Sequence, residues 1–462
     1  MDHAFFEELE ARIPKTGVRT RFAPSPTGYM HVGNLRTALY AWLIARKAGG
    51  AFLLRIEDTD QRRLVPGAVE LIYKTLSDCG LTHDEGPDVG GPVGPYVQSE
   101  RRALYGRYAD LLIQRGGAVR CEEAGSSIVR QRIPKEGETS FHDEVFGDIT
   151  LANDSLDEGV LLKSDGLPTY NFANVVDDHL MGVTHVVRGA EYLSSTPKYN
   201  LLYESFGWTP PKYVHCASVM RDATHKLSKR AGDPTYEDLL TAGYLPEAIV
   251  NYVALLGWSP GGERELFTLS ELTEVFDISG ISKSPAIFDL EKLKYFNSAT
   301  IRGLPPADFA RRAEPYIRAA VKNPAYDPDK LAKLLQPRCE TLTDIPEKLD
   351  FFDALPDYDV ALFVHKKSKS DAESSLALLR AALPVLENLE RWDNQSVLDA
   401  LTALAERLGV KNAALLWPVR IALAGRAVTP GGATEIAEIL GRAETLRRLA
   451  LGIEKLEAQQ RP

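Results

Sequence analysis

The stretch VRTRFAPSPTGYMHVGN, residues 18–34, decides the fold of the N-terminal half of this 462-residue chain. Residues 18–23 alternate in polarity, which predicts a short strand, and the PSPTG segment after them predicts a stiff loop. From Asn34 onward the apolar residues fall at helical spacing until Gly49 and Gly50, and residues 51–56 again predict a strand. This order predicts a βαβ unit, in which ligands gather at the carboxyl ends of the strands.

The end of the same stretch places His31 and Gly33 where the helix begins. Free backbone N–H groups and the positive end of the helix dipole attract phosphate at such a position. Gly33 has no Cβ, so a base or sugar can approach the backbone, and His31 can donate a hydrogen bond to a phosphoryl oxygen. A capping or surface role is the alternative for His31, because short His-x-Gly patterns recur by chance.

A second group of elements predicts the other half of the same sheet. Short β-rich runs lie around residues 183–187 and 212–216, and a helix between them begins at Pro197 and ends near Gly207. The basic segment THKLSKR, residues 224–230, follows and is suited to close over a triphosphate. Its candidate phosphate-binding residues are Lys226, Ser228, Lys229 and Arg230. A solvated basic loop is the alternative.

Composition excludes several classes of protein. The length predicts three or four domains, and 44% hydrophobic with 26% charged residues is typical of a globular protein rather than a disordered one. The net charge of −10 argues against bulk coating of nucleic acid, although nearly all the excess acid lies before residue 303. No apolar run is long enough for a membrane span and no signal peptide is visible, so we expect a cytoplasmic protein without membrane partners. The four cysteines form no Cys-x-x-Cys pair.

Several ordered motifs together resemble one family. They are the His31–Asn34 and Lys226–Arg230 segments, RFAPSPTG at 21–28, LRIEDTD at 54–60, LKSDG at 162–166 and NVVDDH at 174–179. In this order they resemble the bacterial glutamyl-tRNA synthetases, which are class I aminoacyl-tRNA synthetases. Two features depart from the family pattern: Asn34 replaces a histidine, and the segment between Cys121 and Leu162 is short and keeps only Cys121 of the zinc ligands that some members use.

The resemblance implies an α/β fold with a Rossmann-type nucleotide-binding catalytic domain, an inserted acceptor-binding domain, a connector and all-α anticodon-binding domains. The catalytic domain would occupy residues 1–93 and 169–218, interrupted at 94–168 by a shortened insertion in which a helical pattern precedes a short irregular region. The expected remaining parts are a basic loop with a stem-contact connector at 219–302 and two helical anticodon-binding subdomains at 303–365 and 366–462.

The resemblance also implies the reaction and its residues. ATP, accompanied by Mg²⁺, would activate L-glutamate to glutamyl-adenylate and pyrophosphate, and the acyl group would pass to the 3′ end of tRNA(Glu). No zinc is expected, because a closed site needs four ligands and Cys121 is the only thiolate in its part of the sequence. His31, Gly33 and Lys229 would carry catalysis, and Glu191 would join the phosphate-binding residues on the ATP side. The implied glutamate-binding residues are Arg21, Ala23, Ser25, Glu57, Tyr170, Asn174 and Arg188. For Tyr170 and Arg188 a buried core tyrosine and a surface ion pair are the alternatives. We expect a monomer.

Arg338, in the helical half, resembles the family position that reads the last anticodon base, where the glutamate and glutamine anticodons differ. A guanidinium offers donors to a pyrimidine carbonyl, which would favour glutamate tRNA. A helix-end arginine in a surface ion pair is the alternative. Charging of tRNA(Gln) in addition to tRNA(Glu) stays open at this point.

Four other functions compete with this interpretation. Glutaminyl-tRNA synthetases share the catalytic half but read the anticodon with β-barrels, and few strand-like runs follow residue 303. A catalytically silent tRNA-binding protein would have no need of His31, Glu57, Arg188 and Lys229 together. A small-molecule nucleotidyltransferase, or a short tRNA-modifying paralogue, would leave about 160 helical residues without a purpose.

Overall fold

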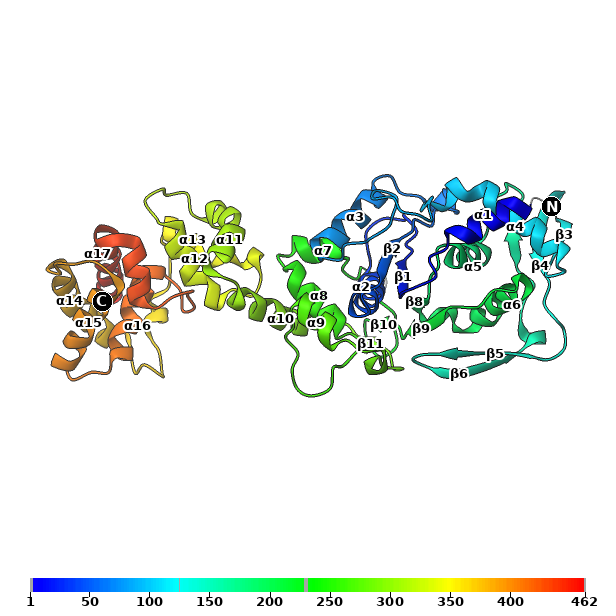
Figure 1. The fold of residues 1–462 in the computed structure, drawn as a ribbon. Coiled ribbons are helices and arrows are strands. Elements are labelled where there is room, and N and C mark those ends of the chain that lie inside the picture. Colours follow the sequence, from blue (N-terminus) through cyan, green and yellow to red (C-terminus); the bar gives the residue numbers. More distant parts are fainter. Residues whose placement is uncertain (1–2, 124, 228–231, 461–462) are drawn as a thin grey trace. The chain divides into compact units, whose positions relative to one another are not determined.

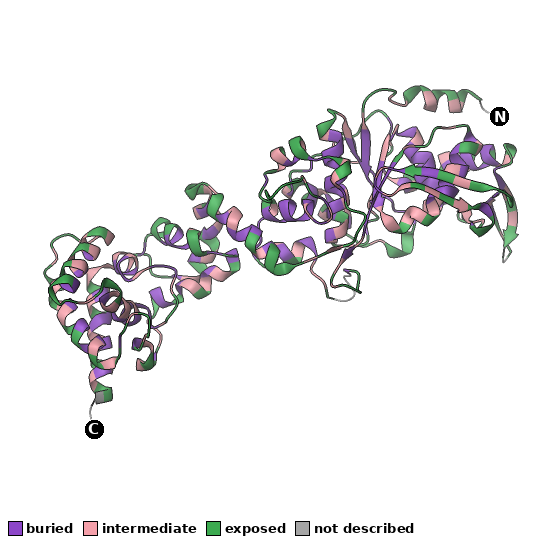
Figure 2. Ribbon diagram, turned by 90° about the horizontal axis from the view of Figure 1, so that it is seen from below, coloured by how far each residue is buried: buried purple, intermediate pink, exposed green. Residues whose placement is uncertain are grey.

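The computed structural model describes residues 3–123, 125–227 and 232–460, which fall into two compact units (Figure 1). The first unit contains Met1–Thr241 and Pro246–Phe296, and the second contains Ala242–Leu245 and Asn297–Pro462. Figure 2 shows buried residues inside each unit and exposed residues on their surfaces. No helix among the described residues is long and apolar enough to cross a membrane.

A six-stranded sheet forms the centre of the first unit, in the order β2-β1-β8-β9-β5-β6. The first five strands run parallel to their neighbours, and β6 pairs antiparallel with β5. The strands are β1 (Arg19–Phe22), β2 (Ala51–Leu54), β5 (Glu138–Asp143), β6 (Gly147–Ala152), β8 (His185–Gly189) and β9 (Lys212–Cys216). This sheet confirms the predicted α/β fold class and both predicted halves of the sheet.

Local sequence explains why the first βαβ unit forms. All four residues of β1 are buried, including Arg19 and Arg21, because a parallel strand inside a layered fold is covered on both faces. Helix α2 (Val32–Lys47) packs against β1, β2 and β8. Gly50 begins the return to β2, where a Cβ would lie 2.1 Å from the carbonyl oxygen of Val18, so only glycine allows this approach of the backbones.

The inserted region differs from the expectation in one respect. The segment expected to be irregular contains β3 (Ala118–Glu123), β4 (Ser126–Gln131), β5, β6 and β7 (Val160–Leu162), after helix α4 (Arg102–Gln114). The expectation of a short irregular region was wrong. In residues 138–143 and 147–152, more buried and more exposed side chains alternate every second residue, as in the two strands of a hairpin. Gly147, with φ 82°, lies at its turn. Strands β3, β4 and β7 form a separate antiparallel sheet, whereas β5 and β6 extend the main sheet.

Helices complete the first unit. Helices α5 and α6 pack against each other, and α6 also packs against β5. As predicted, α6 has a proline in its first turn and ends at Gly207, which takes the left-handed conformation. The remaining elements are α1 (His3–Arg12), α3 (Ala68–Asp78), α5 (Tyr170–Leu180), α6 (Thr196–Phe206), β10 (Val219–Met220), α7 (Tyr236–Thr241), α8 (Pro246–Ala254), α9 (Leu269–Val275), β11 (Ala286–Ile287) and α10 (Leu290–Gly303), whose last part belongs to the second unit.

The second unit is helical, as predicted. Between residues 303 and 460 the described chain contains no strand, and only an isolated bridge joins His365 and Ser370. This part of the chain therefore lacks the β-barrels that the glutaminyl alternative requires. Its helices are α11 (Pro306–Ala320), α12 (Pro328–Leu335), α13 (Ile345–Asp353), α14 (Ala372–Glu387), α15 (Asn394–Arg407), α16 (Asn412–Ala424) and α17 (Ala433–Gln460), which bends at Gly441.

Candidate active site

Two cavities open at the carboxyl ends of the parallel strands in the first unit. The larger has a volume of about 950 Å³ and the smaller of about 380 Å³. They share part of their walls, namely Ser25, Thr27, Glu57, Tyr170 and Tyr192. Such a position is where ligands bind in open α/β sheets. Two compartments with a common wall can hold two substrates so that their reacting groups meet.

The smaller cavity brings together most of the predicted site. Its wall includes ten of the predicted residues. They come from β1 and its loop, the start of α2, α5, β8 and the segments after β2, β8 and β10, and are Arg21, Ala23, Ser25, His31, Gly33, Glu57, Tyr170, Arg188, Glu191 and Lys226. Asn174 does not line either cavity and donates instead to the Tyr170 carbonyl at 2.6 Å. Ser228, Lys229 and Arg230 lie outside the described residues.

The start of α2 has the geometry expected of a phosphate-facing helix end. His31 is the N-cap, and its Nδ1 accepts a hydrogen bond from the Gly33 N–H at 3.1 Å. Capping is thus part of the role of this histidine, and the same residue lines the smaller cavity. Across this cavity wall, Lys226 Nζ lies 4.0 Å from a carboxylate oxygen of Glu191, and both side chains are more than half exposed.

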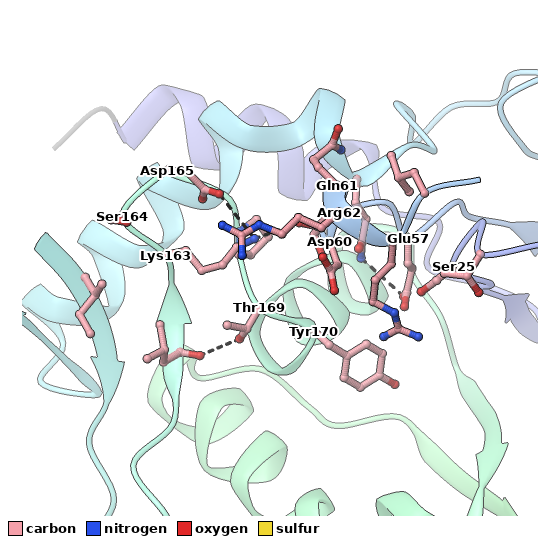
Figure 3. A pocket seen from close by; sticks show the side chains of 18 of the residues that line it. Ser25, Glu57, Asp60, Gln61, Arg62, Lys163, Ser164, Asp165, Thr169 and Tyr170 are labelled. Carbon is pink, nitrogen blue, oxygen red and sulfur yellow. Dashed lines mark hydrogen bonds and ion pairs between the residues drawn. The ribbon is translucent and has the colours of Figure 1, made fainter. Parts of the chain in front are cut away.

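The larger cavity carries a mixed set of charges (Figure 3). The segment after β2 contributes Asp60, Gln61 and Arg62, and the loop after β7 contributes Lys163 and Asp165. Figure 3 shows these side chains on one side and Ser25, Glu57 and Tyr170 on the side that borders the smaller cavity. Basic groups beside hydroxyl and amide groups suit the backbone and end of a single-stranded nucleic acid.

A buried network of charges lies behind the shared wall. Arg55 Nη1 donates to Asp178 at 2.7 Å and Nη2 donates to Glu57 at 3.0 Å, while Arg21 Nε donates to Asp178 at 3.1 Å. Asp177 receives hydrogen bonds from Arg101 and from the Tyr105 hydroxyl, each at 2.8 Å. Three arginines thus face three carboxylates with little access to water, which fixes the position of Glu57 on the cavity wall.

The network shifts the titration of its carboxyl groups in opposite directions. Burial raises the pKa of Glu57, although Arg55 and Arg21 oppose the shift. Burial would also raise the pKa of Asp178, but Arg21 and Arg55 outweigh it and hold the pKa below its ordinary value. Arg21 is therefore already paired with Asp178, so its guanidinium would have to bind a ligand and Asp178 at the same time.

Arg188 differs from Arg21 and Arg55, because it is a buried cation without an acidic partner among the described residues. No carboxylate among the described residues lies within ion-pair distance of its guanidinium, which is 5% exposed and lines the smaller cavity. It bonds to His215 and Thr196, and its carbon Cζ lies 4.8–5.3 Å from the ring centres of Tyr192, Tyr199 and Tyr213. A buried cation surrounded by aromatic rings and neutral acceptors can bind an anionic ligand group. The alternative of a surface ion pair was wrong, because Arg188 is buried.

Sequence reasoning missed the groups that support this site. Asp178 and Arg55 received no role, although an arginine that follows the apolar run of β2 is a sign of a buried partner. His215 and Asp143 were also missed, and no local pattern could have joined them because 72 residues separate them along the chain.

The described residues hold no cluster of three or more His, Cys, Asp or Glu side chains arranged for a metal ion. Cys121 lies in β3 opposite Ile128 of β4. In the second unit, Arg338 ends a short 3-10 helix, Gln336–Arg338, and its Nη2 lies 3.8 Å from Glu435 with about half of the arginine side chain exposed. Among the described residues, then, the site offers no protein ligand cage for a metal. Arg338 has a loose ion pair at the surface, and its predicted contact with an anticodon base stays a prediction.

Comparison with known proteins defines the class. Residues 17–128 and 122–295 match the family model described as tRNA synthetases class I (E and Q), catalytic domain, and residues 308–453 match an anticodon binding domain. The chain is accordingly a class I tRNA synthetase.

The more similar relatives define the family within that class. Glutamate–tRNA ligases from Clostridium botulinum and Clostridium tetani are 54% and 52% identical to this chain, covering 96% and 95% of it and 99% and 98% of the relatives. The crystal structure of a glutamate tRNA ligase from Elizabethkingia meningosepticum in complex with its amino acid superposes with a TM-score of 0.86 at 30% identity, covering 95% of this chain and 99% of that one. The chain belongs to the bacterial glutamate–tRNA ligase family.

Proposed function

We propose that this chain is the ATP-dependent ligase that activates L-glutamate and transfers it to tRNA(Glu) for protein synthesis. The observation that carries this proposal is Arg188, a buried guanidinium without a carboxylate partner on the wall of the smaller cavity. An arginine fork binds a carboxylate through two parallel hydrogen bonds, and Glu57 on the same wall suits an ammonium group. An amino acid with a side-chain carboxylate supplies both.

The first step needs positioning rather than a protein nucleophile. An oxygen of the glutamate α-carboxylate attacks the α-phosphorus of ATP, and the bond to the bridging oxygen breaks so that pyrophosphate leaves. His31 and the N–H groups at the start of α2 stabilise the charge that develops on the phosphate oxygens, and Gly33 leaves room for the nucleotide. Lys226, Ser228, Lys229, Arg230 and Glu191 complete the ATP side in this proposal. The glutamate side consists of Arg21, Ala23, Ser25, Glu57, Tyr170, Asn174 and Arg188.

The second step uses the shared wall of the two cavities. We assign the larger cavity to the 3′-terminal adenosine of tRNA, because Arg62 and Lys163 offer cations among its mixed charges and Tyr170 and Glu57 border both compartments. A ribose hydroxyl there attacks the acyl carbon of the adenylate, and AMP leaves. This arrangement keeps the adenylate beside its acceptor.

Metal use, assembly and location complete the proposal. Mg²⁺ would be held chiefly by the phosphates of ATP and by water, in keeping with the described residues, which offer no clustered carboxylate cage. Zinc is not expected, because a closed site needs four ligands and the described residues offer no group of three or more His, Cys, Asp or Glu side chains arranged for a metal ion. We propose a monomer that works in the cytoplasm, where protein synthesis takes place.

Steady-state aminoacylation of Arg188→Leu tests the assignment. Loss of a charge-assisted hydrogen-bonded pair costs about 1.5–3 kcal/mol, so KM for glutamate should rise roughly tenfold or more while KM for ATP stays within about twofold. Arg264→Leu, which removes an exposed arginine paired with Glu271, is the matched control and should change neither constant. Unchanged glutamate KM in Arg188→Leu would remove Arg188 from the amino-acid site. Retained tRNA binding without any charging by the wild-type chain would favour the silent tRNA-binding alternative.

A further inference from the structure

Arg188 is connected to a buried histidine and a buried aspartate that the proposed reaction does not use. Arg188 on β8 and His215 on β9 are direct partners in the parallel register, so their side chains lie together on one face of the sheet. Arg188 Nε–H donates to His215 Nε2 at 3.0 Å. His215 Nδ1 lies 2.6 Å from Oδ2 of Asp143, the last residue of β5. Both His215 and Asp143 are fully buried.

Asp143 determines which histidine nitrogen carries the proton. Its Oδ1 accepts from the backbone N–H groups of Val145 at 3.0 Å and Phe146 at 2.8 Å, and its Oδ2 accepts from the His215 backbone N–H at 3.2 Å. A carboxylate held in this way is only an acceptor, so the His215 ring must donate Nδ1–H to it. Nε2 then presents its lone pair to the Arg188 Nε–H.

Electrostatics agree with this arrangement of protons. Burial would raise the pKa of Asp143, but the hydrogen bonds from His215 and from the backbone N–H groups of Phe146 and Val145 hold it below its ordinary value. Burial lowers the pKa of His215, Asp143 opposes the shift, and the charge of Arg188 adds to it, so the pKa lies below the ordinary value. A neutral ring facing an ionised carboxylate on one side and a guanidinium on the other satisfies all three groups.

Thr196 holds the same guanidinium at a second point. Arg188 Nη2 donates to the Thr196 hydroxyl at 2.7 Å, and that hydroxyl donates to the Tyr192 carbonyl at 2.8 Å. Two anchored nitrogens define the plane of a guanidinium, and its other N–H groups are then preorganised for a ligand. The surrounding tyrosine rings cannot fix the directions of the Arg188 N–H groups. The attraction between a cation and a ring face changes little when the guanidinium rotates within its own plane.

We propose that Asp143 and His215 are positioning residues that hold Arg188 in the orientation in which it recognises the side-chain carboxylate of the amino-acid substrate. This inference rests on the proposed role of Arg188 and deepens it. Preorganisation of the fork makes the site reject an amide in place of a carboxylate, because the fixed N–H groups would then face an NH₂ donor. Asp143 thus connects the inserted segment, through β5, to amino-acid specificity.

Two substitutions of His215 separate positioning from a structural role. His215→Asn keeps a donor near the Nδ1 position for Asp143 but has no acceptor at the Nε2 position, whereas His215→Gln can place its side-chain oxygen near Nε2 and accept from Arg188. We expect His215→Asn to raise KM for glutamate about tenfold and to lower the preference for glutamate over glutamine by a similar factor, with KM for ATP within about twofold. His215→Gln should stay within about threefold of wild type on both measures.

Asp143→Asn tests the tautomer separately. The amide of the new asparagine can donate to His215 Nδ1, which would move the ring proton to Nε2. The His215 Nε2–H and the Arg188 Nε–H would then be two donors facing each other. We expect the same pattern as in His215→Asn. Thermal unfolding of each variant checks that the variant is folded. Asp143→Asn conserves the size of the side chain, so this variant still tests the proposal if His215→Asn does not fold.

Arg188→Leu distinguishes failure of this inference from failure of the proposed function. If Arg188→Leu leaves glutamate KM unchanged, the proposed role of Arg188 is wrong and the positioning role falls with it. If Arg188→Leu raises glutamate KM but folded His215→Asn and Asp143→Asn do not, the proposed function stands and the positioning role is overturned. Equal losses in His215→Asn and His215→Gln, or equal rises in the KM values for glutamate and ATP, would also overturn it. The positioning role would be supported if His215→Asn raises KM for glutamate but not KM for ATP, and if His215→Gln keeps both values near those of wild type.

Discussion

Arg55 and Arg188 are both buried arginines of the first unit, but their surroundings give them opposite roles. Arg55 faces Glu57, Asp177 and Asp178, so its charge is neutralised inside the protein and it serves the structure. Among the described residues, Arg188 meets neutral acceptors and aromatic rings but no carboxylate, so its charge is left for a ligand. Residue type alone could not separate the two in the sequence, because the difference lies in partners that are distant along the chain.

Removal of Arg55 should therefore cost stability. Arg55→Leu leaves buried carboxylates without their counter-ion, and breaking such a pair costs about 3–5 kcal/mol. We expect urea-induced unfolding, followed by circular dichroism, to show a loss of this size. Arg130→Leu, which removes the partially exposed partner of Glu123, should cost less than about 1 kcal/mol. Equal effects of the two substitutions would contradict the account of the buried network.

At the scale of elements, the strand, loop and helix pattern of residues 18–56 could be predicted because each step has a local cause. Apolar periodicity, the loop prolines and Gly49–Gly50 lie within the segment that they shape. The strands of the insertion were not predicted, although β3 with β4 and β5 with β6 pair as neighbouring hairpins, because each alternation is short. The junction of β5 with the main sheet has no local signal, since Asp143 pairs with Tyr213 of β9, 70 residues away. Among the candidate site residues, those next to strand ends were found, and those that support them across strands were missed.

Helix α2 combines a structural and a chemical role at His31. We expect His31→Ala to slow adenylate formation at least about tenfold, since a lost charge-stabilising donor typically costs about 2.7–4 kcal/mol, and to lose about 1 kcal/mol of stability with the cap. His31→Ser keeps a capping oxygen and should restore stability without restoring the rate. Rapid-quench measurement of the first turnover, with thermal unfolding alongside, checks both; a normal rate in His31→Ala would remove it from the chemistry.

Lys229, which lies outside the described residues, gives a parallel prediction on the basic segment. Lys229→Ala should slow the same first turnover at least about tenfold, because the ammonium group neutralises charge on the leaving pyrophosphate. Stability should be unchanged in thermal unfolding. A first-turnover rate near that of wild type would argue for a solvated loop at this segment.

Helix α17 offers a pH test of an element in the second unit. Hydrogen bonds from Arg447, and then from Arg448, lower the pKa of Glu444 to about 2 although partial burial opposes them. Because the folded pKa lies below the unfolded one, Glu444 stabilises the fold above about pH 4.5, and this contribution is lost as the pH falls toward 2. Calorimetry should show Glu444→Gln melting below wild type at pH 7 and the difference shrinking in acid. A difference independent of pH would contradict this role.

At the scale of the whole molecule, amino-acid chemistry and anticodon recognition belong to different units. The two cavities lie in the first unit, whereas Arg338 lies in the helical second unit. The helical half was predictable from its regular leucine spacing. The role of a single exposed arginine within it was not, because an ion pair and a base contact look alike in sequence.

Arg338→Gln tests the division between the units. If Arg338 reads the last anticodon base, the variant should charge tRNA(Gln) better relative to tRNA(Glu), while KM for glutamate stays within about twofold. Arg380→Gln, which removes another exposed ion pair of the second unit, should leave the ratio unchanged. An unaltered tRNA preference in Arg338→Gln would assign Arg338 to its surface ion pair with Glu435.

The most direct test of the central claim is aminoacylation by the full wild-type chain. Purified tRNA(Glu) and tRNA(Gln) would each be incubated with ATP, Mg²⁺ and labelled glutamate or glutamine, and the product bound to tRNA would be counted. We predict that glutamate is attached to tRNA(Glu) with release of pyrophosphate, and that glutamine is attached to neither tRNA. Attachment of glutamine, or no attachment of glutamate to tRNA(Glu), would contradict the account.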